Sequence, residues 1–84
     1  MNIKIYYCGE WNYLPEASRL EEELKGNFSD VFVELIEGKG GTFLVIVNDA
    51  VIFDKLALPK NKAEFPKNEE ISNIIYELKK SNKN

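Results

Sequence analysis

The sequence has no histidine and a single cysteine, Cys8. These counts exclude a disulfide framework and leave almost no means of building a structural zinc site, so no metal is expected. Positive charge is also scarce, because eleven lysine and arginine residues face fourteen aspartate and glutamate residues, for a net charge of −3. Nucleic-acid backbones are bound by clustered positive charge, so nucleic acid is not an expected partner.

Long apolar runs are missing as well. No stretch approaches the ~18 residues that a membrane span needs. The N-terminus alternates like a strand and does not form a basic region followed by an apolar signal core. Eighty-four residues, 44% of them hydrophobic and 30% charged, suit a small folded protein. We therefore expect one domain over residues 1–80, a frayed polar tail over 81–84, a cytoplasmic location and no membrane contact.

Strand-like patterns mark four segments, which are residues 2–7, 31–37, 42–47 and 50–55. Asn48-Asp49 links the last two, and both side chains tolerate the positive φ of a two-residue hairpin turn. A glycine-rich break at 38–41 separates the second segment from the third. We interpret Gly40-Gly41 in this break as a tight turn rather than a phosphate-binding nest.

Helical spacing appears twice, first at Tyr13, Ala17, Leu20 and Leu24 and again at Ile71, Ile74, Ile75 and Leu78. Asn12 is the expected N-cap of the first helix, and Pro15 fits its first turn. Gly26-Asn27 is expected to end that helix in a left-handed cap. Glu21 and Lys25 stand four residues apart in the favourable order for an ion pair.

The element order is therefore β-α-β-β-β-α. A strand–helix–strand unit crosses over with its strands parallel, whereas the hairpin must be antiparallel. The arrangement that satisfies both is a mixed four-stranded sheet in the order 2-1-3-4, with two helices on one face. This α/β skeleton is that of a small thioredoxin-like fold.

The segment 7–15 joins the first strand to the first helix and contains Cys8. Unpaired N–H groups and the positive end of a helix dipole stabilise negative charge on a sulfur placed there. In thioredoxin-like proteins a second cysteine three residues later attacks a mixed disulfide formed on the first. Trp11 occupies that second position here. The alternative is that Cys8 is a small buried apolar residue, and the residues alone leave both interpretations open.

Several motifs follow one another over most of the chain: Ile5-Tyr6-Tyr7-Cys8, Asn12-Tyr13-Leu14-Pro15 with Ala17, Leu20 to Leu24, Val33-Glu34-Leu35 before Gly38, Gly40-Gly41 before Phe43, and Phe65-Pro66. In order and spacing they resemble the selenoprotein W-like (Rdx) family of small thioredoxin-fold proteins. The resemblance implies a Cys-x-x-Sec or Cys-x-x-Cys redox pair at Cys8 and position 11. It also implies thiol or selenol oxidoreductase activity, without a tightly bound cofactor and with glutathione as a co-substrate.

Trp11 departs from the family pattern at its most important position. Selenocysteine is encoded by UGA and tryptophan by UGG, so a UGA codon changed or translated to tryptophan gives this sequence. A natural loss of the second redox residue is the competing account, and the intact neighbouring motifs favour the first. Without a second sulfur the chain should be impaired in a dithiol cycle. It should still form mixed disulfides with its expected partners, glutathione and protein thiols.

Two other function classes stay open. One is a non-catalytic protein-binding module that uses the motif loop as its contact surface. The other is a carrier of a small ligand, which would bind glutathione equally well without Cys8.

The third strand is apolar on both sides. If Phe43, Val45 and Val47 meet the helices, Leu44 and Ile46 point to the opposite face of the sheet. A contiguous exposed apolar patch usually marks a contact surface. We therefore expect weak self-association or partner docking through Leu44 and Ile46.

Overall fold

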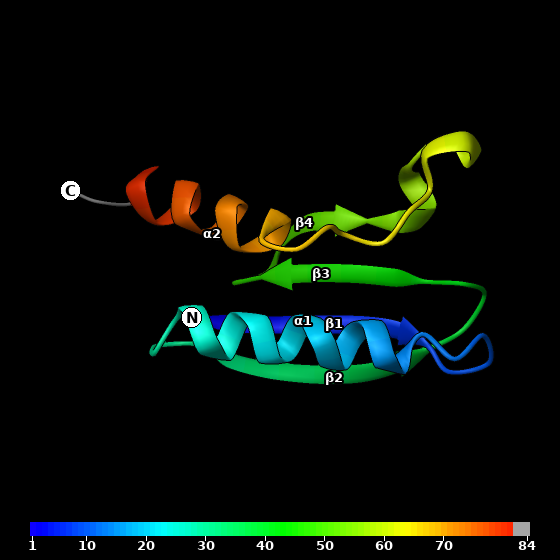
Figure 1. Ribbon diagram of the computed structural model, residues 1–84, viewed down its shortest axis with the longest axis horizontal. Helices are drawn as coiled ribbons and strands as arrows, with labels where there is room; N and C mark the ends of the chain where they lie inside the picture. The colour runs from blue at the N-terminus through cyan, green and yellow to red at the C-terminus, as the bar shows by residue number, and fades with distance from the viewer. Residues whose placement is uncertain (82–84) are drawn as a thin grey trace.

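Four strands and two helices form two layers in the computed structural model, which describes residues 1–81 (Figure 1). The strands are β1 (Asn2–Cys8), β2 (Phe32–Gly38), β3 (Phe43–Val47) and β4 (Ala50–Asp54). The helices are α1 (Leu14–Asn27) and α2 (Glu70–Ser81), and two short 3-10 helices span Lys55–Ala57 and Lys60–Lys62. The predicted α/β class and element order are confirmed. Residues 82–84 of the expected polar tail lie outside the described residues.

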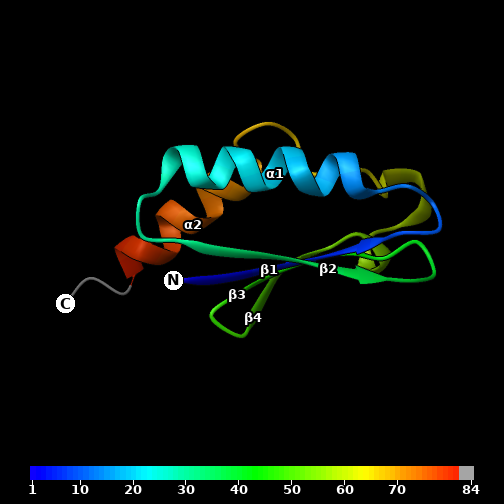
Figure 2. The same ribbon diagram turned by 90° about the horizontal axis from the view of Figure 1, so that it is seen from below.

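The strand order in the sheet is β2-β1-β3-β4, as predicted. β1 pairs in parallel with β2 and antiparallel with β3, and β3 pairs antiparallel with β4. Both helices lie on the same face of this sheet (Figure 2). Within residues 1–81, none of these helices has the length and apolar character needed to cross a bilayer.

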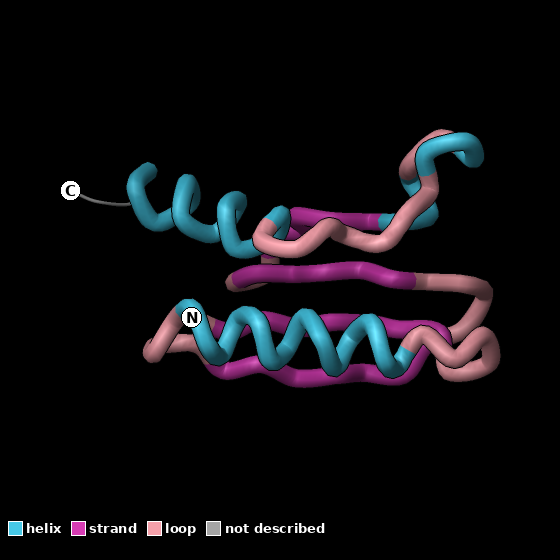
Figure 3. The backbone as a smooth tube through the Cα atoms, viewed as in Figure 1, coloured by secondary structure: helices cyan, strands magenta, loops and turns pink. Residues whose placement is uncertain are grey.

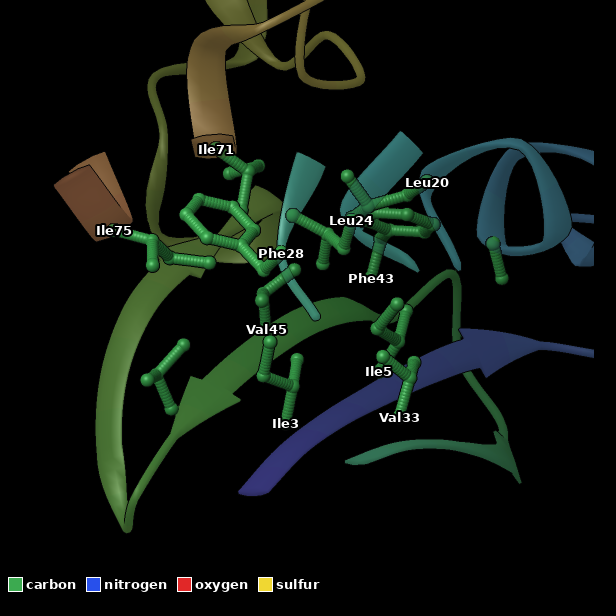
Figure 4. Close-up of a cluster of buried hydrophobic side chains, with 12 residues drawn as sticks. Ile3, Ile5, Leu20, Leu24, Phe28, Val33, Phe43, Val45, Ile71 and Ile75 are labelled. Atoms are coloured by element: carbon green, nitrogen blue, oxygen red, sulfur yellow. The ribbon is translucent and has the colours of Figure 1, made fainter. Parts of the chain in front are cut away.

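The core lies between the helices and one face of the sheet (Figure 4). Its residues come from all layers and are Ile3, Ile5, Ala17, Leu20, Leu24, Phe28, Val33, Phe43, Val45, Val47, Ile71 and Ile75. The predicted helical faces thus point inward, and so do alternate residues of β3. The hairpin prediction is also correct, because Asn48 and Asp49 have φ values of 48° and 72°.

The ends of α1 differ from their prediction. Asn12 does not cap the helix: it adopts a φ of 57° in the preceding turn, and Tyr13 takes the N-cap position without a side-chain cap. Gly26 and Asn27 form no left-handed cap, because they are the last helical residues and the extended Phe28 follows. Burial of the Phe28 ring explains this ending, since an extended backbone carries the ring inward.

A polar contact between the two helices was not predicted. Ser72 of α2 is fully buried, and its hydroxyl donates to the Glu23 carboxylate at 2.6 Å. The same carboxylate accepts the backbone N–H of Glu69, at the start of α2, at 3.2 Å. Negative charge at a helix N-terminus is stabilising, so Glu23 fixes the start of α2 against α1.

An exposed ion pair joins α2 to the loop before β2 and makes the stability depend on pH. The hydrogen bonds from Lys79 Nζ, at 2.8 and 2.9 Å, hold the pKa of the Asp30 carboxyl below its ordinary value. A carboxyl group whose pKa is lower in the folded than in the unfolded state stabilises the fold. This contribution is fully present at pH values above the unfolded-state pKa and is lost as the pH falls through the folded-state pKa.

Replacing Lys79 by methionine should therefore return the pKa of Asp30 to its ordinary range, as followed by NMR titration of its carboxyl group. Lys80→Met is the matched control, because Lys80 pairs with Glu77 and not with Asp30. An Asp30 pKa that is the same in Lys79→Met as in the parent protein would contradict this assignment.

Candidate functional site

Cys8 is the last residue of β1 and lies opposite Gly38 of β2. Its side chain is fully buried, yet it is not part of the contiguous hydrophobic core. The N–H of Gly9 donates to the carbonyl oxygen of Gly38 at 3.3 Å, which continues the β1–β2 pairing past the cysteine. The thiol is therefore enclosed at the end of the sheet, and a reagent reaches it only if the neighbouring chain moves.

The turn between β1 and α1 is held by few hydrogen bonds. The Asn12 N–H donates to the Gly9 carbonyl at 3.2 Å, and the Tyr13 N–H donates to the Cys8 carbonyl at 3.0 Å. α1 follows at once, as predicted, because the Tyr13 carbonyl accepts the N–H of Ala17. Cys8 is therefore followed by the turn of residues 9–13 and then by α1. The hydrogen bond from the helix start reaches its carbonyl oxygen rather than its sulfur.

Trp11 projects from this turn, and 61% of its surface is exposed. Its ring lies over Gly41 in the loop between β2 and β3, which meets the turn at the same end of the sheet (Figure 3). Gly41 is buried with a φ of 77°, and a β-carbon there would overlap the Trp11 ring. The structure thus brings position 11 against Gly41, the second residue of the glycine pair that the sequence singled out as a turn.

Aromatic contacts connect the turn to the core. The Trp11 ring meets Tyr13 edge-on at 6.0 Å between centroids, and Tyr13 meets Phe65 at 4.7 Å. Phe65 in turn meets Phe43 of β3 at 5.2 Å. The ammonium of Lys55 lies 5.5 Å from the Tyr13 ring and 5.4 Å from the Phe65 ring. Lys55 was not expected here, because no local pattern places residue 55 beside residue 13.

The site offers sulfur and aromatic surface but no set of metal ligands. Within the described residues, no three cysteine, aspartate or glutamate side chains gather closely enough to hold a metal ion. Gly40 and Gly41 stand at the loop where larger thioredoxin-fold proteins carry a cis-proline. All the peptide bonds described here are trans.

Comparisons with known proteins agree with this geometry. The sequence model of the Rdx family matches residues 2–77. A selenoprotein W-related protein from Vibrio cholerae is 28% identical, with a TM-score of 0.80 over 92% of this chain and 94% of that chain. A protein from Bordetella parapertussis is 25% identical, with a TM-score of 0.80 over 92% and 95%. A search among curated proteins found no match. The chain belongs to the Rdx family, and its fold is that of the thioredoxin-like, selenoprotein W-related proteins.

Proposed function

We propose that this protein is a thiol redox protein in which Cys8 exchanges disulfides with glutathione or with protein thiols. One observation carries the proposal: the only cysteine stands at the end of β1, directly before the turn into α1, in a chain of the Rdx family. Cytoplasmic glutathione would keep Cys8 reduced between reactions and would act as a co-substrate rather than as a bound cofactor.

The chemistry requires only the Cys8 sulfur and an incoming disulfide. The Cys8 thiolate attacks one sulfur of oxidised glutathione, the glutathione S–S bond breaks, and one glutathione leaves as a thiolate. Cys8 then carries a mixed disulfide. Because Trp11 has no sulfur, a second thiol from solution must attack this bond to restore Cys8. The chain as it stands is thus proposed to work with a single thiol.

Burial of Cys8 requires that the turn open before each attack. Gly9 and Asn12 lie in this turn and are held by backbone hydrogen bonds, whereas Tyr13 at its end packs against the core. Segments with few buried apolar contacts open at lower free energy than the core does. We expect a local opening of residues 9–12 to expose the sulfur while Tyr13, the sheet and the helices stay in place.

Incubating the folded protein with oxidised glutathione should give one glutathionyl adduct in the intact mass spectrum. Reduced glutathione should remove that adduct. Cys8→Ser is the control and should gain no mass, because the chain has no other cysteine. Failure of the folded protein to form the adduct, under conditions that modify the urea-unfolded chain, would contradict the proposed function.

A non-catalytic binding module is the second candidate, and the contrast between Trp11 and Cys8 favours it. Trp11 presents a large exposed ring, whereas Cys8 is fully buried. Exposed tryptophan is a frequent anchor of protein interfaces. Such a module would keep its partner in Cys8→Ser and lose it in Trp11→Ser, whereas a redox protein would show the reverse.

A further inference from the structure

One face of the sheet is covered by neither helix (Figure 2). Its outward side chains, which we call the open face, are Asn2, Lys4, Tyr6, Phe32, Glu34, Ile36, Leu44, Ile46, Val51 and Asp54. Phe43, Val45 and Val47 are buried on the helix side, so Leu44 and Ile46 face outward between them. Six of the ten side chains are apolar or aromatic, which makes the open face a candidate contact surface.

Two opposite charges stand side by side on the open face. Lys4 of β1 and Glu34 of β2 are paired in the parallel register, and both are exposed. Among the side chains that the structure describes, neither forms an ion pair. Lys4 and Glu34 therefore present one positive and one negative group side by side, each free to bind a charge of the opposite sign.

The open face also carries an exposed aromatic ring that helps to line a hollow. Phe32 is 67% exposed, the largest exposed fraction among the large hydrophobic side chains described. Phe32 is itself part of the lining of a hollow of about 330 Å³, together with Asn2, Lys4, Glu34, Ile46 and Asn48. The hollow therefore runs across β2, β1 and β3, and Phe32 belongs to its β2 side.

We propose that the open face binds a second copy of this chain, sheet against sheet, in a two-fold dimer. A two-fold axis that runs parallel to the strands, between β1 and β2, exchanges the positions of these strands across the interface. It places Lys4 of each copy against Glu34 of the other, so that both ion pairs form together. The same rotation places Phe32 of each copy over Asn2 of the other, at the hollow.

Complementarity in charge favours a second copy as the occupant. In a two-fold dimer the same surface of both copies forms the interface, so each charged group must meet its opposite on an identical surface. Lys4 and Glu34 meet this requirement about one axis. A surface that binds a different protein needs no such internal match.

The size of the open face predicts a weak dimer. The axis between β1 and β2 sets only these two strands of each copy face to face. Seven-residue strands ~4.8 Å apart, with ~3.3 Å per residue, give a contact well below ~1,200 Å², the lower bound of standard interfaces. We therefore expect a reversible dimer whose population rises with protein concentration. High salt should weaken it, because the ion pairs lie near the edge strand β2 and are open to screening.

Sedimentation velocity at rising concentrations tests the proposal with charge-reversed variants. Lys4→Glu and Glu34→Lys should each raise the dissociation constant at least tenfold, because each variant sets like charges against one another. An equimolar mixture of the two variants should restore dimers, since each copy then meets opposite charges. Glu22→Lys, an equal charge change on the exposed side of α1, is the control and should leave the dimer unchanged.

Phe32→Ala provides an independent test of the same interface. Circular dichroism verifies that every variant keeps its fold. Phe32→Ala should also raise the dissociation constant at least tenfold, because the exposed ring that packs over Asn2 of the other copy is lost. A parent protein that stays monomeric at every concentration would overturn the proposal. A dimer that persists in Lys4→Glu and in Phe32→Ala would also overturn the proposal, because the association would then use another surface. A mixture of the two charge-reversed variants that stays monomeric would overturn the proposal as well.

Discussion

Trp11→Cys should turn this chain into a dithiol protein that closes a reversible disulfide between positions 8 and 11. Both positions belong to the turn that the hydrogen bond from the Tyr13 N–H to the Cys8 carbonyl closes. A disulfide needs its two Cα atoms about 4.4–6.8 Å apart, a separation that one tight turn provides. Mild oxidation should lower the intact mass by two hydrogen atoms and leave no thiol to alkylate.

The same variant should change the fate of the glutathione adduct. In the parent chain the mixed disulfide on Cys8 persists until a thiol is added, because no second sulfur is present. In Trp11→Cys the new thiol attacks the Cys8 sulfur and releases glutathione without any addition. Trp11→Ser is the matched control, because it removes the ring but supplies no thiol. A Trp11→Cys protein that stays folded and fully reduced under mild oxidation would contradict position 11 as a redox position.

Phe43→Ala should cause the largest loss of stability among core substitutions. Phe43 is fully buried in β3 and contacts the rings of Phe53, at 6.3 Å, and Phe65, at 5.2 Å. Truncating a buried phenylalanine costs about 3–5 kcal/mol. A domain of 84 residues has a free energy of unfolding of about 4–13 kcal/mol, so this loss removes much of the total. Urea unfolding followed by circular dichroism measures it.

Phe43→Ala should also weaken the packing of the candidate site. Phe65 packs between Phe43 and Tyr13, so a cavity at Phe43 removes the support behind the turn. Phe43→Leu is the control, because it keeps an apolar side chain in the cavity, and it should cost clearly less. A Phe43→Ala protein as stable as Phe43→Leu would show that Phe43 does not link the turn to the core in this way.

The architecture followed from the sequence because few topologies satisfy its local patterns. Strand and helix periods defined the six elements, and Asn48-Asp49 fixed the hairpin. The parallel β1–β2 crossover then left one consistent sheet order. The inward face of β3 could be inferred as well, because alternation and the position of the helices settle which side is buried.

The details of the site were less predictable because they depend on contacts between distant residues. Local sequence suggested Asn12 as a helix cap, but Asn12 adopts a left-handed conformation that the tight turn requires. No sequence pattern near Cys8 indicates that neighbouring loops bury its side chain. The contact between Ser72 and Glu23 joins residues 49 apart in the chain, and no periodicity signals such a pair.

The rate at which Cys8 reacts with oxidised glutathione tests the central claim most directly. It should be measured by intact mass at neutral pH for the folded protein and for the same chain unfolded in urea. If Cys8 is a redox thiol at the end of β1, before the turn into α1, the folded protein should react at least as fast as the unfolded chain, because activation of the sulfur offsets the need to open the turn. A folded protein that reacts only as fast as it unfolds globally would show that Cys8 is a buried packing residue, and would contradict the account.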